Sequence, residues 1–336
     1  AGIGGADAIT VLPFTAALGL PDAFARRVAR NTQLILLDES NLARVADPAA
    51  GAGGFEALTD ALCEKTWGLF QEIEREGGIL ESLKGETLQG RIAAVRAQRE
   101  KAVATRREPI TGTSEFPNIN EADVTILMPM PAVTDSTGSA PQGAAASTET
   151  SFASLVQMAA DGATLPQLAI TAAGSSAVAV APLPSIRVAE AFERLRDISD
   201  AYRARTGARP KVFLANLGSI ADFTARATFA KNFFEAGGIE SVMNEGLTNQ
   251  NSLREAFSAS KAKISCICST DDIYKLHAPA TARTLHEAGS KLIFLAGRPG
   301  EDQKELAGAG ITSFIFSGCD TLKVLGEALD KACAEA

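Results

Sequence analysis

The sequence predicts an α/β protein whose carboxyl-terminal half, residues 185–336, forms a doubly wound parallel sheet. In this half, short apolar runs alternate with amphipathic stretches, which is the pattern of repeated strand-helix units. The first run, Lys211–Asn216, is followed at once by Leu217-Gly218-Ser219 and an amphipathic stretch. In an open α/β sheet, ligands lie beyond the carboxyl ends of the strands. We therefore expect this turn to meet any ligand.

Composition sets the broad class of the protein. A chain of 336 residues with 46% hydrophobic content can hold about two domains with buried cores. The net charge of −8 and the absence of a basic stripe with interleaved aromatics argue against a nucleic-acid partner. No apolar run is long enough to span a membrane, and the first residues do not form a signal peptide, so we expect a cytoplasmic protein with no membrane partner. Because the chain begins Ala1-Gly2 without Met, we also expect that something upstream is missing.

The first 76 residues are predicted to contain about two strand-helix units. The expected elements are a buried strand at Asp7–Phe14, a helix at Pro21–Glu39, a short strand around Arg44–Asp47 and a helix at Phe55–Glu76. Pro21 suits the first turn of its helix because its missing N–H would be unpaired there. The loop Gly51–Gly54 lacks the Gly-Lys-Ser/Thr ending of a phosphate-binding loop, and we interpret it as a flexible connection.

Residues 77–184 are predicted to connect the two ends of the protein. The expected parts are a charged helix at Glu81–Arg107, a linker at Pro129–Thr150, a short helix at Ser151–Ala160 and a second small-residue stretch at Ala172–Pro184. The helix should stop before Pro109, because the residue before a proline avoids helical geometry. The linker consists largely of small and polar residues, which cannot bury enough apolar surface to fold alone. We expect Pro129–Pro184 to be extended and held against another protein surface.

The elements after residue 185 alternate regularly. An amphipathic helix at Ile186–Ala204 comes first. The expected strands are Lys211–Asn216, Gly238–Val242, Ile264–Ser269, Lys291–Ala296 and Ser313–Phe316. The expected helices are Thr224–Ala236, Leu253–Ser258, Thr281–Ala288, Gln303–Ala307 and Thr321–Cys333. Five strands with intervening helices favour the flavodoxin-like order 2-1-3-4-5. That order brings together the ends of the first, third and fourth strands, which carry Leu217-Gly218, Ser269-Thr270-Asp271 and Ala296-Gly297-Arg298.

The cysteines and histidines predict no metal site. The five cysteines are odd in number and show no CxxC spacing, so neither a disulfide framework nor a zinc site is expected. Cys266 and Cys268 lie in an apolar run. We interpret them as buried structural residues whose sulfurs do not meet, on the argument that alternate residues of a strand face opposite sides. His286 is expected on the surface of a helix and His277 at its approach.

The turn after the first of these strands resembles that of the adenosylcobalamin-dependent acyl-CoA mutases, whose carboxyl-terminal domain carries Lys-x-Gly-x-Asp-x-His-x-x-Gly. The Lys falls on Asn216, the first Gly on Gly218, the Asp on Ile220, the His on Asp222 and the last Gly on Ala225. In the family, the His is the lower ligand of cobalt, and the Asp and Lys support it. An isoleucine cannot take part in such a relay, and an aspartate offers a hard oxygen in place of an imidazole nitrogen.

The resemblance extends over nearly the whole chain, including the runs Leu20–Gln33 and Arg187–Arg196. It implies that residues 1–76 are the last units of a (β/α)8 barrel, although they supply only about two of the eight units. It implies that residues 77–184 are charged helices and an extended belt around a partner subunit. Residues 185–336 would then be a degenerate cobalamin-binding-type domain.

The same resemblance places a slot for the cofactor's nucleotide tail at the strand ends. Gly218, Ser269 and Gly297 fit the family pattern, whereas Thr270 and Ala296 depart from it. We expect a degenerate slot of Gly218, Ser269, Thr270 and Gly297, with no catalytic residue and no cobalamin bound by this chain.

The departures match the small, non-catalytic subunit of heterodimeric mutases that interconvert methylmalonyl-CoA and succinyl-CoA. This similarity implies a large catalytic partner that holds adenosylcobalamin and is stabilised by this chain. The alternative is a stand-alone flavodoxin-like module that binds a small molecule or carries cobalamin. The sequence does not determine which acyl-CoA is the substrate.

Overall fold

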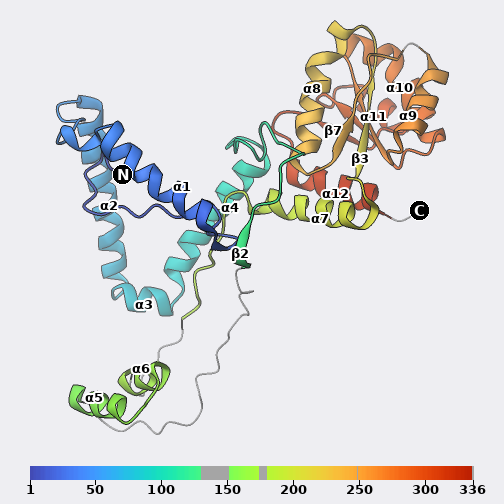
Figure 1. The fold of residues 1–336 in the computed structure, drawn as a ribbon. Coiled ribbons are helices and arrows are strands. Elements are labelled where there is room, and N and C mark those ends of the chain that lie inside the picture. Colours follow the sequence, from blue (N-terminus) through green and yellow to red (C-terminus); the bar gives the residue numbers. More distant parts are fainter. Residues whose placement is uncertain (130–150, 174–179, 248, 335–336) are drawn as a thin grey trace. The chain divides into compact units, whose positions relative to one another are not determined.

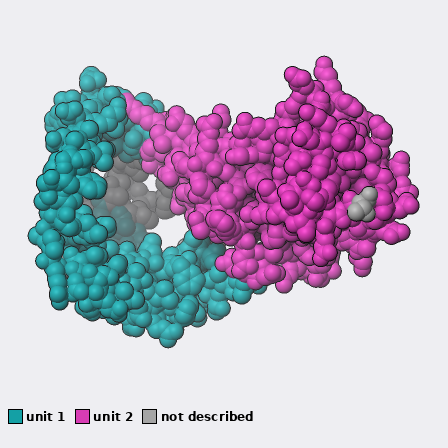
Figure 2. Space-filling model, turned by 90° about the horizontal axis from the view of Figure 1, so that it is seen from above, with its two compact units in different colours: residues 1–89, 122–182 teal, residues 90–121, 183–336 magenta. Residues whose placement is uncertain are grey.

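The computed structural model of the chain describes residues 1–129, 151–173, 180–247 and 249–334. Two compact units are present, and each is described by itself. The first unit comprises residues 1–89 and 122–182, and the second comprises residues 90–121 and 183–336 (Figure 2). No helix in these described ranges is both long and apolar enough to cross a membrane.

The second unit is built on a five-stranded parallel sheet (Figure 1). Its strands are β3 (Lys211–Asn216), β4 (Glu240–Val242), β5 (Ile264–Cys268), β6 (Leu292–Ala296) and β7 (Ser313–Ile315). They are ordered β4-β3-β5-β6-β7, which is the predicted order 2-1-3-4-5. All four neighbouring pairs are parallel, so the carboxyl ends of β3, β5 and β6 share one edge.

Six helices accompany this sheet in the described part of the unit that follows residue 183. They are α7 (Glu190–Thr206), α8 (Ile220–Ala236), α9 (Gln250–Ser260), α10 (Asp271–Glu287), α11 (Gln303–Gly308) and α12 (Thr321–Cys333). The largest difference from prediction is α10, which starts ten residues before Thr281. Pro279 lies inside this helix, where a proline ordinarily marks a boundary. His277 therefore lies on α10 itself rather than at its approach, and both histidines are exposed.

Two apolar layers flank the sheet, because successive residues of each strand point to opposite faces. Leu214 and Phe294 face a layer that includes Phe234 of α8 and Leu325 of α12. The other layer packs strand residues such as Phe213, Ile267 and Leu295 against Phe257 of α9 and Leu285 of α10. Helices thus cover both faces, and the sheet is doubly wound as predicted.

Cys266 and Cys268 correct one prediction. Their Sγ atoms lie 3.9 Å apart, so the sulfurs do meet. Neighbouring residues of a strand face opposite sides, but residues two apart face the same side, and both cysteines point into the layer of α8 and α12. Both are buried, as predicted. Burial raises the pKa of the Cys266 thiol, which keeps it neutral.

The first unit is mainly helical. Its elements are β1 (Gly19–Pro21), α1 (Ala23–Leu34), a π-helical turn (Ile35–Glu39), a 3-10 turn (Leu42–Arg44), α2 (Gly53–Arg75), α3 (Ile79–Lys84), the start of α4 (Thr87–Ala104), β2 (Ile126–Pro129), α5 (Phe152–Ala160) and α6 (Leu165–Ala173). Strands β1 and β2 pair antiparallel. The predicted helices at Pro21–Glu39, Phe55–Glu76 and Ser151–Ala160 are confirmed within a few residues.

Three predictions for this part of the chain are wrong. Asp7–Phe14 forms no strand, and neither does Arg44–Asp47, where a 3-10 turn ends at Arg44 and the chain then bends. A parallel strand is stable only beside a partner, and the described residues supply none for these segments. The helix at Glu81–Arg107 is broken into α3 and α4 at Gly85–Glu86, where Glu86 has φ +58°.

The predicted extended segment Pro129–Pro184 is described only in part. Residues 130–150 and 174–179 lie outside the described residues, so the linker prediction at Pro129–Thr150 concerns residues that are almost all outside them. Phe152–Ala160 and Leu165–Ala173 are helical, so the segment is not extended throughout. The side chains of Phe152 and Leu165 are exposed.

The first unit buries very little of its apolar surface. Among its described residues, Ala25 and Ala29 are the apolar side chains that are buried. Helix α2 buries none of its 23 residues. Trp67 and Phe70 stack on each other with ring centroids 5.2 Å apart, yet both are exposed.

Candidate functional site

The turn between β3 and α8 requires glycine and is sealed by a neighbouring side chain. Gly218 has φ +86°, a region that residues with a Cβ seldom adopt. A Cβ at this position would lie 2.6 Å from Cδ1 of Ile273 and 2.8 Å from Oδ2 of Asp222. Ile273 belongs to α10, so this helix closes over the turn where a ligand was expected.

Asp222, at the position of the family's cobalt-ligating His, caps its own helix. Its Oδ2 accepts hydrogen bonds from Ser219 N at 2.7 Å and from Ser219 Oγ at 2.6 Å. These bonds lower the pKa of Asp222, because they favour the charged form. A carboxylate in the first turn also suits the positive end of the helix dipole. Ile220, at the position of the family's Asp, is 66% exposed.

Asn216, at the position of the family's Lys, fastens a loop across the end of β3. The side chain is fully buried, and its Nδ2 donates to Asn244 O at 2.9 Å. Asn244 Nδ2 in turn donates to Leu214 O at 2.5 Å, and Leu247 N donates to Asn216 O at 3.0 Å. A Cβ at Gly246 would lie 2.9 Å from Gly218 O, so this loop packs closely on the turn.

The backbone N and the Oγ of Ser269, at the end of β5, both donate hydrogen bonds within the chain. Its Oγ donates to Leu217 O at 2.8 Å, and its N donates to the hydroxyl of Tyr274 at 2.8 Å. That hydroxyl lies 3.1 Å from Ile267 O and 2.9 Å from Ala296 O, so its proton is shared between the ends of β5 and β6. Burial raises the pKa of Tyr274, and the hydroxyl remains protonated.

Gly297, at the end of β6, is covered by Arg226 of α8. A Cβ at Gly297 would lie 3.2 Å from Nη1 of Arg226. The guanidinium lies 5.0 Å from the ring centroid of Tyr274, and its Nη2 donates to Asp271 Oδ1 at 2.7 Å. Thr270 is exposed and precedes the first residue of α10.

The predicted slot residues Gly218, Ser269 and Gly297 thus lie along one edge of the sheet, as expected, but the space beside them is filled. The filling groups come from the chain itself: Ile273 and Tyr274 of α10, Arg226 of α8 and the loop around Gly246. A cofactor tail would have to displace them, so the residues present do not fit cobalamin. We therefore derive no chemical step through that group.

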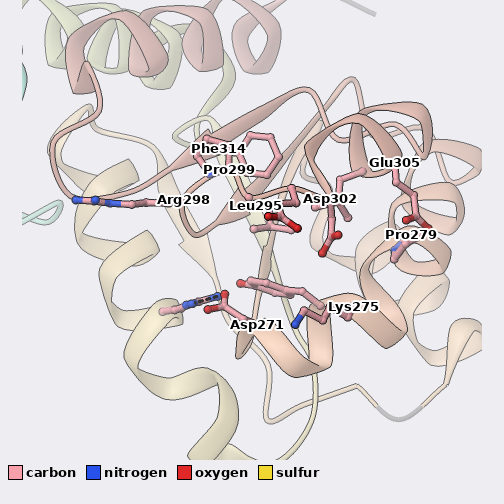
Figure 3. Close-up of a pocket in the computed structure, with 14 residues that line it drawn as sticks. Asp271, Lys275, Pro279, Leu295, Arg298, Pro299, Asp302, Glu305 and Phe314 are labelled. Atoms are coloured by element: carbon pink, nitrogen blue, oxygen red, sulfur yellow. Dashed lines mark hydrogen bonds and ion pairs between the residues drawn. The ribbon is translucent and has the colours of Figure 1, made fainter.

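A cavity of about 740 Å³ lies beyond the ends of β6 and β7, next to the slot, because Arg226, Asp271 and Tyr274 also line it. Its floor includes Leu295 and Phe314, and charged side chains surround its mouth. Figure 3 shows Lys275 and Asp302 reaching in from opposite sides, with Arg298 turned away. No group of three or more His, Cys, Asp or Glu residues able to hold a metal is found among the residues that the structure describes.

The fold and the site together define a doubly wound α/β protein in which its own side chains pack against Gly218 and Gly297, with a cavity beside them. Comparison of the sequence with known families assigns the chain to one of them. The profile of the methylmalonyl-CoA mutase family matches residues 1–177, more than half of the chain. The chain belongs to this family.

The chain is similar to proteins described as methylmalonyl-CoA mutase small subunits. It is 46% identical over 331 residues to the one from Streptomyces virginiae, covering 98% of this chain and 45% of that protein. It is 34% identical over 333 residues to the one from Propionibacterium freudenreichii subsp. shermanii, covering 98% and 44%. A methylmalonyl-CoA mutase from Rhizobium meliloti is 37% identical over 125 residues, or 37% of this chain. The chain spans less than half the length of the small subunits it matches.

Proposed function

We propose that this chain is part of a non-catalytic small subunit of an adenosylcobalamin-dependent methylmalonyl-CoA mutase and stabilises a catalytic large subunit. The observation that carries the proposal is the closed slot, in which Asp222 caps α8 where the family motif has a cobalt ligand. The similarity to small subunits over 98% of the chain supports it. Adenosylcobalamin belongs to the partner in this account, and so does the interconversion of methylmalonyl-CoA and succinyl-CoA.

The arrangement of the first unit supports a structural role. We propose that residues 1–76 are the last units of a (β/α)8 barrel, that residues 77–184 connect them to the sheet, and that residues 185–336 are a degenerate cobalamin-binding-type domain. The small subunits it matches are more than twice as long as the matched segment. The exposed apolar side chains of α1 and α2, such as Phe24 and Trp67, suit burial against further barrel units.

Helices α5 and α6 fit the proposed belt around a partner. Phe152 and Leu165 are among the most exposed apolar side chains that the structure describes. Ordering such a segment costs about 1 to 2 kcal/mol of backbone entropy per residue. Burial of these side chains on a partner surface would offset that cost.

One observation favours a different function. The cavity beyond β6 and β7 has the size of a small-molecule site, and a stand-alone binding module would use it. Its charged groups are of both signs, however, so they favour no particular class of ligand. A cobalamin carrier would instead need the slot that Arg226, Ile273 and Tyr274 fill.

Association with the large subunit tests the proposed function. We expect the catalytic subunit to gain thermal stability when the chain is added, because a partner that binds only the folded state stabilises it by about 2.7 kcal/mol at 100 times the dissociation constant. The chain alone should not turn over methylmalonyl-CoA. The measurements are thermal unfolding of the large subunit with and without the chain, and an isomerisation assay of each.

An equal mass of an unrelated acidic protein is the control for nonspecific effects. Turnover by the purified chain would refute the non-catalytic role. A large subunit that is equally stable and soluble without the chain would refute the stabilising role.

A further inference from the structure

We draw no further inference here: the strongest candidate, the cavity beyond the ends of β6 and β7, carries nothing because it belongs to the site already described, with Arg226 and Tyr274 bordering both, and its charged side chains of both signs select no class of ligand.

Discussion

Replacing Phe234 with alanine is expected to lower the free energy of unfolding of the second unit by about 3 to 5 kcal/mol. Phe234 is fully buried between α8 and the sheet. Its ring centroid lies 5.5 Å from that of Phe233 and 5.3 Å from that of Phe294, both in edge-to-face geometry. Truncation removes these contacts and leaves a cavity that the surrounding helices cannot fill without moving.

Urea unfolding followed by circular dichroism measures this effect. Ile220→Ala is the matched control, because that side chain is on the same helix but largely exposed, and it should change stability by less than about 0.5 kcal/mol. Equal effects of the two substitutions would contradict the packing described for α8.

Restoring the Lys, Asp and His of the family motif, with Asn216→Lys, Ile220→Asp and Asp222→His, is expected to destabilise the second unit without creating cobalamin binding. Asn216 is fully buried under the loop that contains Asn244, so a lysine there would bury a charge. An unpaired buried charge costs about 3 to 5 kcal/mol. Asp222→His also removes the carboxylate that accepts hydrogen bonds from Ser219.

Cobalamin binding should still fail in this triple variant because the slot stays closed. Ile273 remains against Gly218, and Arg226 remains against Gly297. Electron paramagnetic resonance of the variant mixed with cobalamin provides the readout, with Asp222→His alone as the control for the missing relay. A histidine-ligated corrin in either variant would show that the closed slot does not decide binding.

The sheet could be predicted from the sequence because its signals are local. Short apolar runs between amphipathic stretches indicated all five strands and their order. The resemblance to the family placed Ile220 and Asp222 where the family motif has Asp and His. The start of α10 was missed because Pro279 lies within the helix. The strand prediction at Asp7–Phe14 failed because apolar composition alone does not supply a strand with a pairing partner.

The closure of the slot could not be predicted in the same way. Arg226 and Tyr274 come from different helices, and they meet over Gly297 only after the sheet has brought α8 and α10 together. The spacing of these residues in the sequence does not predict that contact. Ser269 and Gly297 match the family pattern of an open slot. The residues that pack against them lie in helices, and the apolar periodicity of those helices indicated only that one face is buried against the sheet.

Equilibrium dialysis of the unmodified chain against cobalamin, followed by corrin absorbance, tests the closed slot most directly. The account predicts equal cobalamin concentrations on both sides of the membrane and no shift of the corrin bands, because Arg226, Ile273 and Tyr274 occupy the space that the cofactor tail would need. Saturable retention of one cobalamin per chain, with or without a change of cobalt ligand, would contradict it and favour a cobalamin carrier instead.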